Sequence, residues 1–120
     1  MKSFEIRKHY FIESSRSLDH LPSHHPCSNK QGHSFKITLC LQGALDTNHW
    51  VMDYSDIDKA FAPLKSKIDH IDLNTVKGLE YPTTEVLSAF LYDNLAETLP
   101  QLKWVEMSET HDTYCRYPAT

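Results

Sequence analysis

The chain has 120 residues, of which 40% are hydrophobic and 23% are charged, and its net charge is −4. This length and composition predict one folded domain over residues 1–120 and exclude a disordered chain. Lysines and arginines do not cluster and no apolar run is long enough to span a membrane, so we expect no binding to nucleic acid or membrane. Three widely spaced cysteines imply no disulfide framework, and the first residues lack the apolar core of a signal peptide, so we expect a cytoplasmic protein.

Strands are predicted in the first half of the chain. Apolar residues recur at nearly every second position over residues 4–12, which predicts a strand with one buried face. Residues 13–31 are rich in Ser, His, Pro and Asn and predict a loop. Residues 34–42 alternate without exception and predict the clearest strand of the chain. After a turn, Trp50–Met52 predicts a short returning strand.

Two amphipathic helices follow. Ser55 could cap the first, whose apolar residues are spaced by three and four and so share one face, and Pro63 should kink or shorten it. The second begins near Pro82 and cannot extend past Pro100. The side chains predicted to be buried on the two helices are Ile57, Phe61, Leu64, Ile68, Val86, Leu87, Phe90, Leu91 and Leu95.

The chain ends with two more predicted strands, about residues 102–109 and 113–117. Strands on both sides of a helical pair do not suit parallel crossover units throughout. The order therefore predicts an α+β fold, an antiparallel four-stranded sheet with two helices on one face. The other face of the sheet would stay uncovered, so we expect a partner subunit to bury it.

A thiol, an acid and an imidazole could form a catalytic group. Cys27 stands six residues before His33, where the loop becomes a strand, and Asp69-His70 follows the first helix. Cysteine, histidine and aspartate together are suited to proton transfer or nucleophilic attack. Each also has a simpler interpretation: Cys27 could be an inert loop cysteine, and Asp69-His70 could be a helix C-terminus, where histidine meets the helix dipole favourably.

Five segments resemble the 6-pyruvoyltetrahydropterin synthase and 6-carboxytetrahydropterin synthase family, in particular the bacterial enzyme of queuosine biosynthesis. They are Cys27 to Phe35, Trp50 to Tyr54, Ile68 to Asn74, Gly78 to Glu85 and Glu106 to Thr110. Each is weak alone, but all five occur in order at nearly the spacing of the family. The resemblance implies the T-fold (tunnelling fold), in which trimers close an oligomeric barrel, two trimers can stack into a hexamer, and active sites lie at subunit boundaries.

The resemblance also implies an activity. These enzymes are carbon–carbon lyases that act on dihydroneopterin triphosphate, and their zinc binds and acidifies the side-chain hydroxyls of the substrate. By position, Cys27 would be the base for proton transfer, assisted by Asp69 and His70. Glu109 would anchor the pterin ring, whose amino and ring N–H groups form a paired donor edge. Thr83 and Thr84 would lie near that ring.

The zinc ligands of the family are replaced at two of three positions. Arg16 and Gln31 stand where the family has histidines, and only His33 remains, whereas a catalytic zinc normally keeps three protein ligands. At roughly 4 Å and an effective dielectric of about 20, an arginine repels a divalent ion by about 8 kcal/mol. We therefore expect zinc to be absent or weak. Arg16, with Gln31, could instead meet an oxygen of the substrate; alternatively, Arg16 could turn to solvent while loop histidines (His20, His24, His25) rebuild a site.

Three functions remain open from the sequence. The first is a 6-carboxytetrahydropterin synthase-like lyase that works despite its altered metal site. The second is a zinc-independent paralogue that uses Cys27, Asp69 and His70 on a related pterin. The third is a non-catalytic protein that binds a pterin. In each case the expected partners are a small-molecule pterin and further copies of the same chain.

Overall fold

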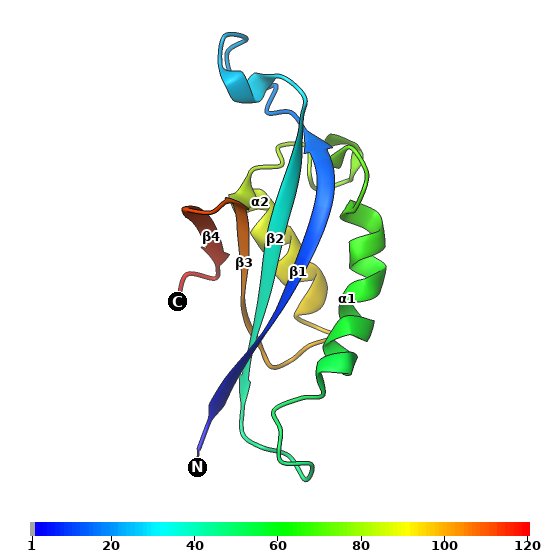
Figure 1. Ribbon diagram of the computed structural model, residues 1–120, viewed down its shortest axis with the longest axis vertical. Coiled ribbons are helices and arrows are strands. Elements are labelled where there is room, and N and C mark those ends of the chain that lie inside the picture. Colours follow the sequence, from blue (N-terminus) through cyan, green and yellow to red (C-terminus); the bar gives the residue numbers. More distant parts are fainter. Residues whose placement is uncertain (1) are drawn as a thin grey trace.

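The computed structural model describes residues 2–120, which form one four-stranded sheet and two α-helices. The strands pair in the order β1-β2-β3-β4, and every pair is antiparallel. Both helices cover the same face of the sheet, so the predicted α+β fold is confirmed (Figure 1). The elements are β1 (Phe4–Arg16), β2 (Gln31–Gly43), α1 (Tyr54–Ile68), α2 (Thr84–Leu95), β3 (Leu102–Thr110) and β4 (Thr113–Tyr117), with short 3-10 helices η1 (Pro26–Ser28) and η2 (Leu73–Thr75).

The β1–β2 hairpin is longer than its apolar pattern predicts. The two strands pair without a break from Phe4 opposite Gly43 to Arg16 opposite Gln31, so the loop between them is residues 17–30, not 13–31. The extension is polar but it still alternates, and Ser14 and Arg16 are buried beside Ile12. The apolar pattern ends early because these inward positions carry polar side chains. This end of the sheet therefore has a buried polar interior.

Three details of the region before α1 differ from the predictions. Trp50–Met52 forms bends rather than a returning strand, and the segment buries Val51 while Trp50 stays exposed. Asp53, not Ser55, caps α1, because its carboxylate accepts the N–H of Ser55 at 2.9 Å. The helix continues through Pro63 to its end, so Pro63 does not shorten it. Its buried face (Ile57, Phe61, Leu64 and Ile68) packs in the core and stabilises it despite the proline.

The hydrophobic core lies between the sheet and the helices. Phe35, Ile37, Leu39 and Leu41 project from β2 on the helix side and are fully buried. On α1, Phe61 stacks against Tyr10 of β1 with ring centroids 4.3 Å apart. The helical side chains predicted to be buried all join this core, with Val86 and Phe90 only partly buried. Each fully buried large apolar side chain contributes about 1.5–3 kcal/mol.

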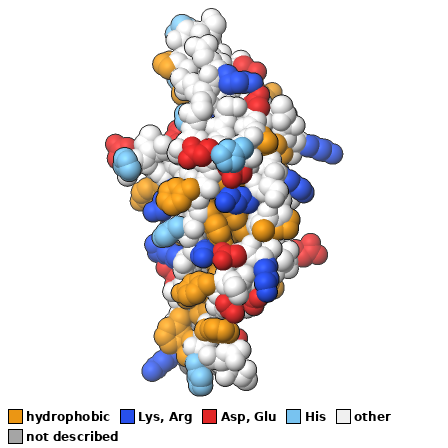
Figure 2. Space-filling view, turned by 45° about the vertical axis from the view of Figure 1, so that its right-hand side comes forward, with side chains coloured by type: hydrophobic (Ala, Val, Ile, Leu, Met, Phe, Trp, Pro, Cys, Tyr) orange, Lys and Arg blue, Asp and Glu red, His pale blue; other side chains and the backbone are white. Residues whose placement is uncertain are grey.

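No helix of residues 2–120 covers the other face of the sheet, which carries both polar and aromatic side chains. Its polar residues include Ser34, Lys36, Glu106 and Arg116, and Phe11 and Tyr114 are exposed on it. Trp104 is covered by the guanidinium groups of Arg7 and Arg116 at 4.9 and 5.0 Å from the ring centroid. Basic and acidic side chains are interleaved on the surface shown in Figure 2. Among residues 2–120, no helix is long and apolar enough to cross a bilayer.

Candidate functional site

Three side chains from three neighbouring strands meet at one end of the sheet: Arg16 of β1, His33 of β2 and Glu109 of β3. We call these the Arg16 cluster. They share the helix-side face of the sheet because each lies an even number of residues from a core residue of its own strand, as His33 does from Phe35. Arg16 Nη2 donates a hydrogen bond to Glu109 Oε2, and His33 Nδ1 lies 3.8 Å from the same oxygen.

Arg16 points into the protein rather than to solvent. Its side chain is 5% exposed, whereas that of Glu109 is 28% exposed. Its second terminal nitrogen, Nη1, donates to the backbone carbonyl of Pro82 at 2.9 Å, and its guanidinium carbon lies 5.3 Å from the centroid of the Phe35 ring. A charge this deeply buried must be paired to be tolerated. Glu109 provides that pairing, and the alternative in which Arg16 turns to solvent is wrong.

His33 is the one imidazole of the Arg16 cluster. Burial lowers its pKa from the ordinary value of 6.5, and the positive charge of Arg16 lowers the pKa further, while Glu109 acts in the opposite direction. The ring is therefore neutral at pH 7. A neutral imidazole is the form that binds metals, but its neighbours do not supply the remaining ligands.

The residues at this position do not fit a zinc ion. Arginine stays protonated and cannot coordinate a metal, and Gln31, a weak ligand, is exposed at the start of β2. Over the part of the chain that the structure describes, no three His, Cys, Asp or Glu side chains are grouped in a way that could hold a metal. His20 packs edge-on against Tyr81, and His25 Nδ1 accepts the N–H of Cys27. Whether purified protein carries zinc stays a prediction.

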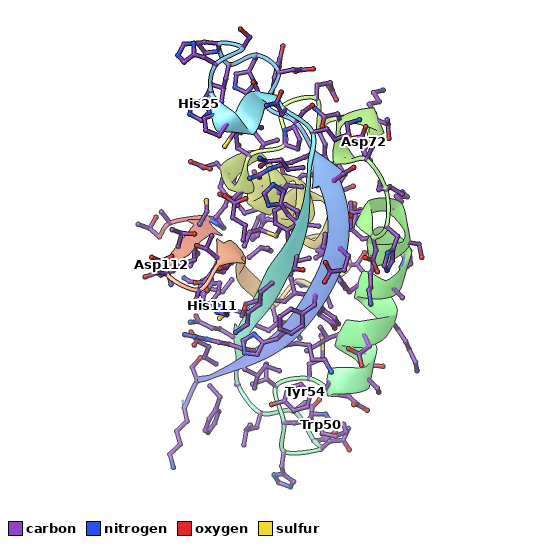
Figure 3. The ribbon with its side chains drawn as sticks, turned by 45° about the horizontal axis from the view of Figure 1, so that its top comes forward. His25, Trp50, Tyr54, Asp72, His111 and Asp112 are labelled. Atoms are coloured by element: carbon purple, nitrogen blue, oxygen red, sulfur yellow. The ribbon has the colours of Figure 1, made fainter. Side chains whose placement is uncertain are left out.

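Cys27 lies in η1, in the loop that projects beyond the end of the sheet (Figures 1 and 3). Its thiol is half-buried, its N–H donates to His25 Nδ1 at 3.1 Å, and its carbonyl accepts the N–H of Leu18 at 2.8 Å. These backbone bonds fix the loop around Cys27 while the sulfur forms no hydrogen bond within residues 2–120. The thiol is thus held in a defined place without a partner of its own.

Asp69 and His70 lie at the C-terminus of α1, against the outer edge of β1. Asp69 Oδ1 accepts the N–H of Glu13 at 2.9 Å, and the N–H of His70 donates to the carbonyl of Glu13 at 2.6 Å. His70 has a φ of 58°, which is unusual for a residue other than glycine, and its side chain is 75% exposed. Its Nε2 lies 3.6 Å from Asp69 Oδ1, so the two side chains are near each other without a hydrogen bond, and their catalytic role stays a prediction. No hydrogen bond or ion pair within the described chain joins Cys27 to this pair.

Thr83 and Thr84 begin α2 next to the Arg16 cluster. Thr83 caps the helix by accepting the N–H of Val86 at 3.1 Å, and the hydroxyl of Thr84 lies 3.0 Å from a carboxylate oxygen of Glu85. The preceding residue, Pro82, accepts the hydrogen bond from Arg16. The threonines themselves make no hydrogen bond to the Arg16 cluster within residues 2–120, and only the carbonyl of Pro82 does.

Asn74 has a structural role that the sequence did not reveal. Its amide pairs with both backbone groups of Ser17, accepting the N–H at 2.8 Å and donating to the carbonyl at 2.8 Å. The same amide nitrogen lies 3.4 Å from the carbonyl of Glu80. Asn74 thus joins the end of β1 to the segment before α2. Its place at the end of the segment Ile68 to Asn74 was visible in the sequence, but its contacts were not.

Two clefts open beside the Arg16 cluster, each containing one of its members. A cleft of about 490 Å³ contains His33 and His70, and its wall is completed by Glu13, Ser14, Ser15, Gly32, Ser34, Ile71 and Asp72. A cleft of about 570 Å³ contains Glu109, together with Phe11, Ser34, Lys36, Glu106, Ser108, Thr110, His111, Thr113 and Tyr114. His111, at the turn between β3 and β4, marks the second cleft in Figure 3. Several residues around the second cleft (Ser34, Lys36 and Glu106) project from the uncovered face of the sheet, whereas the Glu109 carboxylate is bonded to Arg16 on the helix side.

Known proteins resemble this chain over nearly its whole length. Residues 5–120 match the family model described as 6-pyruvoyl tetrahydropterin synthase. A Synechocystis protein named 6-carboxy-5,6,7,8-tetrahydropterin synthase is 33% identical over 119 residues, covering 93% of this chain and 91% of the relative. A Bacillus subtilis protein of the same name is 27% identical over 125 residues, covering 96% and 85%. The structure of Caenorhabditis elegans 6-pyruvoyl tetrahydropterin synthase superposes with a TM-score of 0.90 at 18% identity, covering 100% and 98% of the two chains, and so has the same fold. The chain belongs to the 6-pyruvoyl tetrahydropterin synthase family.

Proposed function

We propose that this protein binds a dihydropterin through Glu109, as a 6-carboxytetrahydropterin synthase-like protein. The observation that carries the proposal is the position of Glu109: its side chain is 28% exposed, and one carboxylate oxygen is paired with a buried arginine while the other accepts no hydrogen bond from residues 2–120. A carboxylate can accept both donors of the amino-pyrimidine edge of a pterin. The names of the Synechocystis and Bacillus subtilis relatives support a pterin as the ligand.

The proposed reaction class is that of the family, carbon–carbon lyase chemistry on dihydroneopterin triphosphate in the queuosine (7-deazaguanine) pathway. Cys27 would take up the proton, and Asp69 would orient His70, whose ring lies free at the protein edge. Because Cys27 does not contact this pair within one chain, we propose that neighbouring subunits combine them in a trimer or hexamer. Light scattering that shows a stable monomer at micromolar concentration would contradict this assembly.

Turnover should be low. Zinc would supply the acidification of the substrate hydroxyls, and Arg16, Gln31 and His33 do not form a site for it. The chain's own residues can still bind the ring and hold the thiol, but they lack a strong acid for the hydroxyls.

The buried position of Arg16 also favours a second candidate, a zinc-independent paralogue that uses Cys27, Asp69 and His70 on a different pterin. A Cys27→Ala variant separates this candidate from a non-catalytic pterin-binding protein. Loss of function in the variant indicates catalysis, whereas a variant that functions as the parent does indicates binding alone.

The binding proposal is tested by calorimetry with neopterin and sepiapterin. We expect both to bind the parent protein and to bind Glu109→Gln more weakly, because glutamine keeps one acceptor for Arg16 but can no longer accept two donors from the ring. If neither compound binds the parent, the proposal is wrong.

A further inference from the structure

We propose that Arg16 is a positioning residue for Glu109: this buried cation, which stands where the family resemblance places a metal ligand, holds the ring-binding carboxylate in place before the ring arrives. The inference rests on the proposed function, since it takes Glu109 as the group that meets the ring. It differs from the sequence-based expectation that Arg16 touches the substrate itself, because it assigns the effect of Arg16 to its contact with Glu109.

The contacts of Arg16 are all within the protein. One terminal nitrogen donates to the carbonyl of Pro82, the other donates to Glu109 Oε2, and the guanidinium carbon lies 5.3 Å from the centroid of the Phe35 ring. With 5% of its side chain exposed, Arg16 presents almost no surface to a ligand. Its action on a ligand bound at Glu109 must therefore pass through the Glu109 carboxylate.

Glu109 is held at one oxygen and open at the other. Arg16 and His33 both approach Oε2, whereas Oε1 accepts no hydrogen bond from residues 2–120. Since 28% of the Glu109 side chain is exposed, this arrangement leaves Oε1 as an acceptor for one ring donor while Oε2 keeps a lone pair for a second. A carboxylate fixed before the ligand arrives loses less conformational entropy on binding than a free one does.

Arginine suits this position for a geometric reason. The guanidinium is planar, always charged, and offers N–H groups in a rigid fork, so one side chain can hold Pro82 and Glu109 at the same time. A lysine would keep the charge, but its single nitrogen has no such fork. Arg16→Lys should therefore keep part of the ligand affinity that Arg16 provides by holding Glu109.

The backbone on both sides of this arrangement is braced. Asn74 pairs with the N–H and carbonyl of Ser17, the residue after Arg16, and its amide also approaches the carbonyl of Glu80, two residues before Pro82. The two segments that Arg16 joins are 66 residues apart in the sequence and are tied together a second time by Asn74. The guanidinium is thus held in place by segments that are themselves fixed.

The test is a double-mutant cycle on the full-length protein, with neopterin as the probe in calorimetry. The variants are Arg16→Met, Glu109→Gln and their combination. Arg16→Met should weaken binding about tenfold, the size of one charge-assisted hydrogen bond. In the Glu109→Gln background the same change should have little further effect, because Arg16 acts only through the carboxylate. A purely structural role for Arg16 would reduce binding by the same factor in both backgrounds.

Controls separate positioning from folding. Arg7→Met makes the same substitution on the uncovered face, where Arg7 pairs with Glu5, and should leave binding unchanged. Arg16→Lys should fall between parent and Arg16→Met, and it keeps the test decisive if Arg16→Met does not fold, since binding equal to the parent would then contradict the inference. If Glu109→Gln weakens binding and Arg16→Met does not, the positioning role alone is wrong. If the parent does not bind neopterin, or Glu109→Gln binds it as the parent does, the proposed function is wrong as well.

Discussion

The two groups of candidate site residues are built in different ways. The Arg16 cluster comes from adjacent strands of one sheet, is largely buried, and is complete within one chain. Cys27 and the pair Asp69-His70 come from a loop and a helix end, lie at the edge of the protein, and are not in contact with each other. The proposed ring-binding group is therefore assembled within one chain, whereas the residues proposed for catalysis are not brought together within one chain.

This difference suggests where the chain can change without loss of its fold. A sheet holds its cross-strand neighbours in place, so a buried position must keep a paired, well-packed side chain. Arg16 meets that requirement through Glu109 and Pro82. An exposed side chain such as that of His70 need not be paired or packed for the chain to fold. Its residue type is therefore explained by what it binds.

The largest expected effect comes from rebuilding the metal site in the Arg16 cluster. Arg16 and Gln31 are cross-strand partners, and His33 lies two residues along β2. Arg16→His with Gln31→His should therefore raise zinc content from well below one to about one per subunit, because three imidazoles complete a site with an open position. Metal analysis of purified protein measures this. Either single change should recover much less, and tightly held stoichiometric zinc with robust turnover in the unmodified protein would contradict the prediction.

The next prediction compares the effects of Glu109 and Cys27 substitutions on neopterin binding. Glu109→Ala should weaken neopterin binding by roughly 2–4 kcal/mol, since charged hydrogen bonds to a desolvated ring edge are lost. Cys27→Ala should leave calorimetric binding unchanged, because the thiol belongs to the other region. Glu109→Ala also leaves Arg16 buried without its partner, so thermal unfolding must be measured beside binding, with Glu109→Gln as the variant that keeps an acceptor. Equal losses from Glu109→Ala and Cys27→Ala would show that the regions are not separate.

A smaller effect tests the brace behind the Arg16 cluster. Asn74→Ala should lower the free energy of unfolding by about 1–3 kcal/mol, because the backbone N–H and carbonyl of Ser17 lose their partners. Urea denaturation measures the change. Asn94→Ala is the matched control, since Asn94 makes one exposed hydrogen bond on α2, and it should alter stability by less than about 0.5 kcal/mol. Equal effects of the two substitutions would remove the special role of Asn74.

The smallest effect concerns the charge of His33. Its pKa is lowered in the folded protein, so between that pKa and the ordinary value of 6.5 the unfolded chain binds more protons than the folded one. Stability should therefore fall as the pH is lowered through 6.5, and should stop falling below the folded pKa. Thermal unfolding over this pH range should show a smaller drop for His33→Gln than for the parent. A parent and variant with the same pH dependence would show that His33 titrates as it does in the unfolded chain.

The sequence predicted the elements whose burial follows a simple period. Alternation in residues 34–42 and the three-and-four spacing from Ile57 to Ile68 located β2 and α1, because each pattern presents one apolar face. It missed the polar ends of β1 and β2, where backbone pairing continues after the apolar pattern stops. It also predicted a strand at Trp50–Met52, where one buried residue, Val51, accounts for the pattern.

The sequence by itself determined the family, the fold class and the identity of the candidate residues, since all of these depend on residue types and their order. Only the tertiary structure decided how those residues are combined. Arg16 and Glu109 are 93 positions apart, and their hydrogen bond exists because β1 and β3 flank β2 at the same end of the sheet. No local sequence pattern predicts the contact between Arg16 and Glu109, because the direction of a buried side chain is set by the packing around it.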